Sequence, residues 1–329
     1  GIHSPGTAYV LLHHYMGDVD GNVGSWGFAR GGTGAVSKAI AGAFKAEVGE
    51  VRTEAGVDKF IVKNGKVTGV ALDNGDEVHA NVVVSAMDVK RTFLTCMDKS
   101  DLPEKFHQRV ENFKIRGSSG KINIALDGLP TFPALPKDSP LYFADMHFTD
   151  SMERMERAYD DWKDGTWSKD PYIDMTIPTT NDPTMAPPGK HFMSCFVQYC
   201  PRQVNGRDWT QEDKDGFQKS VFDQISNYSP DFKDLVLHAE VRTPQDIENE
   251  IGITEGNIFH GELTMDQLMF NRPVPGYAQY RSPIGGLYMC GSSNHPGGGI
   301  MGAPGANAAR EILMDLKRPN TVPENFGDD

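Results

Sequence analysis

The sequence has few cysteines, no long apolar run and no excess of positive charge. Its four cysteines among 329 residues are too few for a scaffold held together by disulfides. No stretch of 18 apolar residues occurs, so the sequence predicts no membrane-spanning helix. The 32 lysines and arginines stand against 45 aspartates and glutamates, a formal charge of −13, which argues against nucleic acid as a partner.

The residue spacings that mark several common kinds of site are also missing. The ten histidines form no H-E-x-x-H motif or comparable ligand set, and we therefore expect no metal site. Four residues separate Cys195 from Cys200, so they do not form a C-x-x-C redox pair, and no G-x-S-x-G hydrolase motif occurs. Segment 18–22 has the spacing that begins a calcium loop, but Val23 and Ala29 stand where that loop needs glycine and glutamate. A polar turn is predicted there.

Glycine and proline are abundant instead, with 35 and 21 residues, and they are densest at 283–305. The run Gly297–Gly302 satisfies G-x-G-x-x-G between a predicted strand at 286–291 and a predicted helix at 306–316. A dinucleotide fingerprint also needs an acidic residue about 20 positions later, where this chain reads Arg318-Pro-Asn-Thr. Small residues at a helix start present backbone N–H groups to a partly anionic planar group, such as a flavin pyrimidine edge. Tight packing of the helix against the strand is the alternative.

The first part of the chain predicts an α/β pattern. Segment 9–15 is expected to be a strand or a buried helix turn, and a helix is expected over 35–48. Four apolar residues of that helix share one face, which we expect to be buried: Ala39, Ile40, Ala43 and Phe44. A short strand is expected at 51–53. Asn-Gly pairs at 64–65 and 74–75 predict hairpin turns around strands at 57–63 and 66–72, followed by a strand within 77–85.

From about residue 88 to 280, short helices alternate with strands. Helices are predicted at 88–96, 103–112, 151–164 and 211–228, and strands at 119–126, 141–148, 172–178 and 191–199. This pattern predicts a second, α+β domain inserted between two pieces of the first domain.

Several segments carry a resemblance to a known family. The run from Gly286 to Ala309, GLYMCGSSNHPGGGIMGAPGANAA, resembles the C-terminal flavin signature of the phytoene desaturase-like flavoproteins. Shorter segments resemble the same family, at 1–6, 9–14, 187–189, 256–260, 266–268 and 272–275. The resemblance therefore extends from the first residue to about Leu316.

The resemblance implies part of a glutathione-reductase-type FAD-binding fold with an inserted mixed-sheet substrate domain. Segment 1–30 would belong to the substrate domain or to an interdomain segment, 31–87 and 281–318 to the FAD-binding domain, and 88–280 to the substrate domain. Segment 319–329 would be a flexible tail. The chain resembles the C-terminal portion of the family's enzymes, without their N-terminal dinucleotide-binding segment. We therefore expect this chain alone to retain little FAD and to be inactive.

The resemblance also implies the residues that contact FAD. Cys290 and Gly291 would end the strand beneath the cofactor, and Val57 would lie near its adenosine side. Backbone N–H groups of Gly299, Ile300 and Met301 would meet the flavin, and Gly302 and Ala303 would allow its close approach. Two side chains are candidates for catalysis, and each has an alternative role. His295 either meets the substrate or braces the loop, and Arg272 either meets cofactor or substrate or forms a structural ion pair.

The implied activity is hydride transfer between flavin N5 and a C–C bond of a lipophilic, polyene or lipid-like substrate. The electron acceptor and oligomeric state are not specified by the sequence, and peripheral contact with a membrane stays open. Two alternatives remain, a redox-neutral flavin-dependent isomerase and a non-enzymatic module that binds an apolar ligand or a protein. The implied location is intracellular, cytoplasmic in a bacterium and the mitochondrial matrix in a eukaryote.

Overall fold

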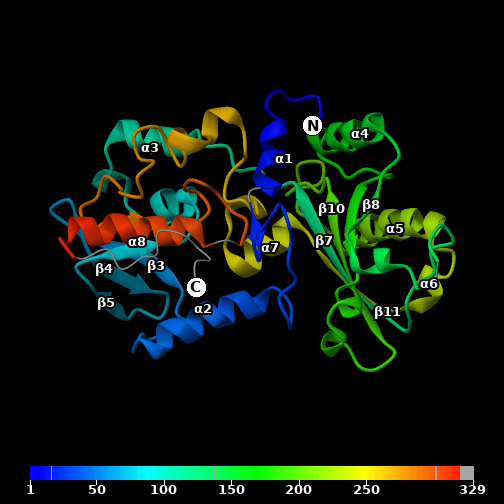
Figure 1. Cartoon of the computed structure of the whole chain (residues 1–329). Coiled ribbons are helices and arrows are strands. Elements are labelled where there is room, and N and C mark those ends of the chain that lie inside the picture. Colours follow the sequence, from blue (N-terminus) through cyan, green and yellow to red (C-terminus); the bar gives the residue numbers. More distant parts are fainter. Residues whose placement is uncertain (16, 137, 301, 319–329) are drawn as a thin grey trace. The chain divides into compact units, whose positions relative to one another are not determined.

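The chain forms two compact units (Figure 1), seen in a computed structural model that describes residues 1–318 apart from 16, 137 and 301. Unit 1 comprises Gly1–Leu11, Gly24–Val48 and Gly117–Ile251. Unit 2 comprises Leu12–Val23, Gly49–Arg116 and the described part of Gly252–Asp329. The predicted tail at 319–329 lies outside the described residues.

Unit 1 is built on a five-stranded antiparallel sheet with the strand order β11-β7-β10-β9-β8. Its strands are β7 (Ser119–Leu126), β8 (Met146–Phe148), β9 (Tyr172–Thr176), β10 (His191–Gln198) and β11 (Val236–Arg242). Burial alternates along β7 and β10, as it does when one face of a sheet packs on a core. That core face carries Ile122, Ile124, Met193, Cys195 and Val197, all fully buried.

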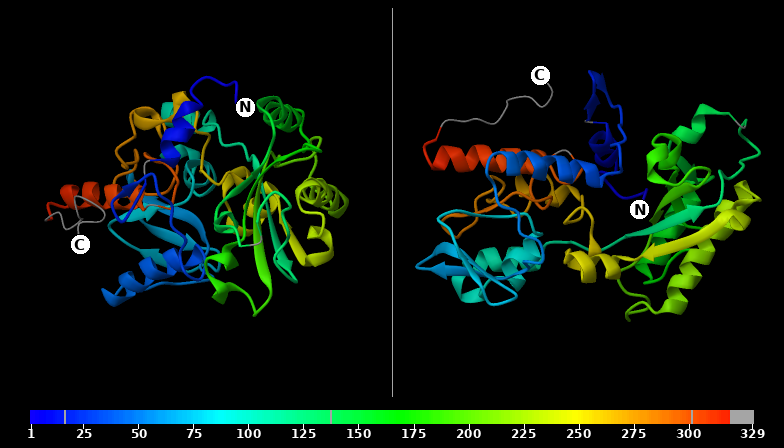
Figure 2. Two further views of the ribbon diagram at one scale, coloured as in Figure 1. Left: turned by 45° about the vertical axis from the view of Figure 1, so that its right-hand side comes forward. Right: turned by 90° about the horizontal axis from the view of Figure 1, so that it is seen from below.

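Two helices of unit 1, at 211–228 and 232–235, contribute side chains to this core, and Figure 2 shows helices alongside the sheet. The helices of unit 1 outside its N-terminal segments are α4 (Met152–Lys163), α5 (Gln211–Tyr228), α6 (Phe232–Leu235) and α7 (Pro244–Ile251). Phe217, Val221 and Ile225 of α5 join the same cluster as the strand residues. Thr210 begins α5 with a capping box, since its hydroxyl accepts from the Asp213 N–H and the Asp213 carboxylate accepts from the Thr210 N–H.

Helix α2 (Gly34–Ala46) forms where the sequence predicts it, but the expected buried face is wrong. None of its 13 residues is buried, and the side chains of Ile40 and Phe44 are 61% and 53% exposed. An apolar stripe shows only that a helix has a side suited to packing, and here no described part of the chain covers it. Helix α1 (Ala8–His14) resolves the strand-or-helix alternative at 9–15, and of its residues only His13 is buried.

The described residues of unit 2 form three small sheets. The first is the antiparallel meander β3 (Val57–Lys63), β4 (Lys66–Leu72) and β5 (Glu77–His79), with turns at both predicted Asn-Gly pairs. The second is a parallel pair, β6 (Val83–Ser85) and β12 (Leu287–Met289). The third is the hairpin of β1 (Asp18–Val19) and β2 (Asn22–Val23), which confirms the predicted polar turn. The helices are α3 (Glu104–Glu111) and α8 (Ala303–Asp315), and a π-helical turn spans Arg91–Thr95.

Other expectations were less accurate. The short strand at 51–53 is absent, and 141–148 begins as a 3-10 turn (Pro140–Phe143) before β8. Further 3-10 turns occupy Lys99–Asp101, Pro178–Thr180, Pro183–Met185, Thr254–Gly256, Met265–Gln267 and Met269–Asn271. The compact units also end at other residues than the predicted domains, since 88–116 and 252–280 belong to unit 2 and 31–48 to unit 1. Which unit binds which ligand stays a prediction.

No helix among the described residues is long and apolar enough to cross a bilayer.

Candidate functional site

The glycine-rich loop lies where the parallel pair β6–β12 ends. The Cys290 N–H, directly after β12, donates to the Ser85 carbonyl at the end of β6 (2.9 Å). A Cβ atom at Gly291 would stand 2.3 Å from the Ala86 carbonyl oxygen, so this close approach of two backbones requires glycine. The loop then leads into α8. The predicted order of strand, glycine loop and helix is confirmed, and the loop leaves from the carboxyl ends of parallel strands, where α/β proteins bind ligands.

Buried polar side chains hold the first half of the loop. The Ser293 hydroxyl donates to the His260 carbonyl (2.7 Å) and accepts from the Val89 N–H (3.1 Å). The Asn294 N–H donates to the Gly291 carbonyl (3.0 Å), and both Ser293 and Asn294 are fully buried. His13 of α1 lies within hydrogen-bond distance of the Gly298 carbonyl, with Nε2 2.8 Å away. This part of the loop is therefore fixed from several sides.

Arg272 lies beneath this loop and is 0% exposed. Its Nε and Nη2 atoms both donate to the Ser292 carbonyl (3.0 and 2.8 Å), and Nη2 also donates to the Phe259 carbonyl (2.7 Å). Nη1 donates to the Glu262 carbonyl (3.3 Å). One guanidinium thus ties the glycine loop to the 259–262 segment through main-chain oxygens. This geometry makes Arg272 a positioning residue, and contact with cofactor or substrate stays an untested prediction.

His295, the other catalytic candidate, is exposed on the loop. Partial burial, and after it the nearby Arg272 cation, lowers the pKa of His295 below its ordinary value, so the ring is neutral near pH 7. Its carbonyl accepts a hydrogen bond from the Tyr280 hydroxyl (2.7 Å), and the Asn307 side chain of α8 donates to that hydroxyl (2.9 Å). The main chain of His295 therefore helps to brace the loop, while its ring is accessible.

The second half of the loop is open. Gly299 is exposed, Ile300 is 69% exposed, and a Cβ atom at Gly302 would meet nothing within 4 Å. Ile300 has φ +58°, a conformation that β-branched residues rarely adopt. Gly302 (φ +66°) precedes Ala303, the first residue of α8, and Pro304 stands in the first turn as predicted. Met301, the remaining predicted contact, lies outside the described residues.

The start of α8 suits an anionic oxygen. Its first turn contains no acidic residue, and its N-cap makes no side-chain hydrogen bond. The first N–H groups of a helix lack intrahelical partners, and the helix dipole makes this end positive. The open glycines let a flat group approach that end closely. These residues therefore fit the pyrimidine edge of a flavin.

The structure does not bring all predicted contacts together. Val57 begins β3 and pairs with Leu72 in the meander, so it is placed in unit 2 but on another sheet than the loop. Burial raises the pKa of the Cys290 thiol, which is therefore protonated near neutral pH and no thiolate nucleophile. Sequence reasoning missed the roles of His13 and Ser293, because neither has a spacing that distinguishes it from any other polar residue near a glycine run.

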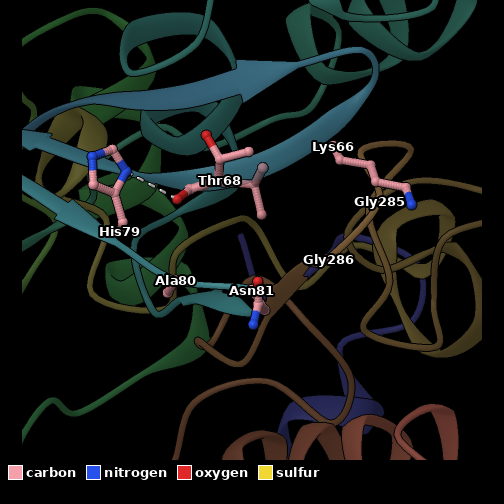
Figure 3. Close-up of a pocket in the computed structure, with 8 residues that line it drawn as sticks. Lys66, Thr68, His79, Ala80, Asn81, Gly285 and Gly286 are labelled. Atoms are coloured by element: carbon pink, nitrogen blue, oxygen red, sulfur yellow. Dashed lines mark hydrogen bonds between the residues drawn. The ribbon is translucent and has the colours of Figure 1, made fainter.

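A pocket of about 550 Å³ also occurs in unit 2, at the other end of the parallel strands (Figure 3). It is lined by Lys66, Val67, Thr68, His79, Ala80, Asn81, Gly285 and Gly286. Asn81 and Gly286 precede β6 and β12, whereas the glycine loop follows these strands. The pocket is therefore separate from the candidate flavin site. Within the described residues, no group of three metal-ligating side chains comes together.

A mixed α/β fold and a glycine loop between a parallel strand and a helix start without acidic side chains are compatible with the class of flavin-dependent oxidoreductases. The sequence model for flavin containing amine oxidoreductases matches residues 4–313, and the chain belongs to that family. The predicted cofactor class, FAD, and the predicted enzyme class, FAD-dependent oxidoreductase, are confirmed at the level of this family.

Relatives agree with this assignment. The chain is 42% identical to the "Pyridine nucleotide-disulfide oxidoreductase domain-containing protein 2" of Rattus norvegicus, over 96% of this chain and 56% of that protein. It is 25% identical to a "Phytoene desaturase (lycopene-forming)" of Pseudescherichia vulneris, over 94% and 59%. The fold resembles an oxidoreductase from Methanosarcina mazei with a TM-score of 0.56 and 18% identity, over 90% and 57%. The chain thus spans little more than half the length of these relatives.

Proposed function

We propose that this chain is the part of an FAD-dependent oxidoreductase that holds the pyrimidine edge of the flavin and contributes to substrate binding. When bound, FAD would supply hydride transfer at N5 to or from a C–C bond of a lipophilic substrate. The whole protein would combine this chain with a dinucleotide-binding segment of the glutathione-reductase type. Family membership supports the cofactor, and the name of the phytoene desaturase relative supports the lipophilic substrate.

The start of α8 is the observation that carries the proposal. Gly299 and Gly302 leave its first turn open, and the positive end of the helix is not neutralised by an acidic side chain of its own first turn. Negative charge that develops on the N1 and O2 side of a flavin on reduction would be stabilised there by oriented N–H groups. Arg272, Ser293 and Asn294 would keep this geometry fixed beneath the open half of the loop.

We further infer that the two units bind different ligands. Unit 2 holds the glycine loop and would bind the cofactor, and unit 1, with its five-stranded sheet, would bind the substrate. His295 has a neutral, accessible imidazole that can accept or donate a proton beside the loop. Arg272 would act on the reaction through the loop that it positions.

The test uses protein produced from its complete coding sequence. We expect visible flavin absorbance after purification, and its retention in the control variant Gly305→Ala, because a Cβ atom at Gly305 inside α8 meets nothing within 4 Å. Gly302→Val should lose the flavin, because it places a branched side chain at the open helix start; since valine also strains the backbone at φ +66°, circular dichroism must show that the variant is folded. Anaerobic bleaching of the bound flavin by a panel of polyenes and acyl lipids would then report hydride transfer.

The outcomes separate the alternatives. If Gly302→Val retained flavin to the same extent as Gly305→Ala, this would contradict the proposal that the pyrimidine edge of the flavin lies at the start of α8. If the purified protein contained no flavin and bound none after addition of FAD, the non-enzymatic binding module would be the remaining interpretation. Conversion of a polyene only in the reduced enzyme, with no net change in flavin redox state, would support the isomerase.

A further inference from the structure

The second face of the unit 1 sheet is polar, in contrast to its core face. Strand register places Arg242, Lys121, Phe196, Asp174 and His147 in one row across β11, β7, β10, β9 and β8. The adjacent row holds Glu240, Asn123, Ser194 and Thr176. Alternation along the strands directs these side chains away from the core packed against α5. Apart from Phe196 in the first row, both rows consist of polar or charged residues.

Lys121 stands near the middle of this face and is only partly exposed. Its ammonium donates to the Ser194 hydroxyl on the neighbouring strand, 2.5 Å away. Among the residues that the structure describes, no second hydrogen bond or ion pair of this ammonium is found. Burial lowers the pKa of Lys121, and the nearby Cys195 and Asp174 oppose that shift. The amine is thus partly shielded from water, and the Ser194 hydroxyl engages one of its donors.

The surroundings of Lys121 indicate the kind of ligand that would use these donors. A partly desolvated ammonium gains most from an oxygen anion, since charge-assisted hydrogen bonds are shorter and stronger than neutral ones. Arg242, directly across on β11, adds positive charge, although Glu240 and Glu250 pair with it. Asp174 is the opposing charge two strands away. Phe196 lies beside Lys121 and offers contact to an apolar chain.

We propose that this face of the sheet binds the carboxylate end of an acyl-type ligand, with Lys121 as its donor and Ser194 as the residue that orients the amine. This inference rests on the proposed function in so far as the ligand is the lipophilic substrate. It adds that the substrate is an amphiphile with an acidic head group rather than a pure hydrocarbon. A hydrocarbon would leave the ammonium of Lys121 with the Ser194 hydroxyl as its acceptor and with no counter-charge, which is unfavourable for a partly buried charge.

The test compares sodium laurate with 1-dodecanol, which has the same chain length and no charge, by calorimetric titration of the 329-residue chain without flavin. We expect laurate to bind at least tenfold more tightly. Lys121→Met should reduce laurate binding to the level of dodecanol, and Lys121→Arg should keep the preference because it keeps the charge. Lys169→Met is the matched control, since Lys169 is an exposed lysine of the same unit.

Site-resolved labelling provides a second readout that does not depend on a variant. Acetylation of lysines, followed by peptide mass mapping, should be slowed at Lys121 by laurate but not by dodecanol, with Lys169 unaffected by either. Equal binding of laurate and dodecanol, undiminished binding to a folded Lys121→Met variant, or no protection of Lys121 would each overturn the proposal. Because no flavin is present, these outcomes are independent of whether the whole protein binds FAD.

Discussion

Replacement of Arg272 by methionine provides the sharpest test of the loop architecture. Methionine fills a similar length of apolar space but removes the guanidinium that holds the carbonyls of Phe259, Glu262 and Ser292. The side chain is 0% exposed, so water cannot readily replace the lost donors. We therefore expect unit 2 to lose stability, with the effect concentrated in the glycine loop and the 259–262 segment.

The magnitude follows from the number of acceptors left behind. An orphaned buried polar group costs about 1–3 kcal/mol, and removal of one side of a buried charged network typically costs about 3–5 kcal/mol. Three carbonyls lose donors within 3.3 Å, and we expect a loss of about 3–5 kcal/mol in the free energy of unfolding. Arg272→Lys should lose less than this, because one ammonium keeps the charge but cannot span all three acceptors.

Hydrogen exchange resolved by peptide is the appropriate assay, because it assigns the change to a segment. Protection should fall in peptides covering 255–300 and persist in β7 of unit 1. Tryptophan fluorescence supplies a separate signal for unit 1, which holds all four tryptophans: Trp26, Trp162, Trp167 and Trp209. A loss of less than about 1 kcal/mol, or unchanged protection around the loop, would refute the assignment of Arg272 as a positioning residue.

Three further perturbations test other parts of the structure. Gly291→Ala should cost about 1–3 kcal/mol in urea unfolding by forcing β6 and β12 apart, and an unchanged midpoint would contradict the close approach. Asp213→Asn should cost about 0.5–2 kcal/mol, because it weakens the cap of α5. Hydrogen bonds from Arg207 hold the pKa of Asp213 well below its ordinary value, so its contribution is full above about pH 4 and falls in acid. Unfolding midpoints from pH 2 to 7 should therefore depend on pH less in this variant than in the parent chain. Ile40→Ser combined with Phe44→Ser should change the stability of this chain by under about 0.5 kcal/mol, and a larger loss would show that α2 is packed.

The sequence predicted those strands and helices that are determined by neighbouring residues, such as a turn or a helix cap. The Asn64-Gly65 turn fixes the register of β3 and β4, and the Thr210 cap with the apolar spacing behind it gives α5 its bounds at 211–228. Strand β11 was missed because His238, Glu240 and Arg242 lie on the polar face, which leaves a weak apolar signal. A polar sheet face looks like a loop in sequence.

Long-range relations could not be predicted in this way. The apolar stripe of α2 indicates that the helix has an apolar side. Whether that side is buried depends on which other parts of the protein pack against it. The candidate site was predicted from the small residues at 297–302, because a run of glycines before a predicted helix is visible in the sequence itself. The sequence did not predict that Arg272 ties the glycine loop to the 259–262 segment. Its acceptors are main-chain carbonyls, and because every residue has one, no sequence pattern marks them.

The pairing of β6 with β12 sets an order of events during synthesis. Val83 pairs with Leu287, so the two strands are separated by roughly 200 residues, including the whole of 117–251 in unit 1. Closing so long a connection has an entropic cost that local contacts do not carry, and such pairings form late. While a ribosome is still adding 252–286, β6 has no β12 to pair with and its edge is open. The glycine loop is therefore completed only after segment 117–251 of unit 1 has been made.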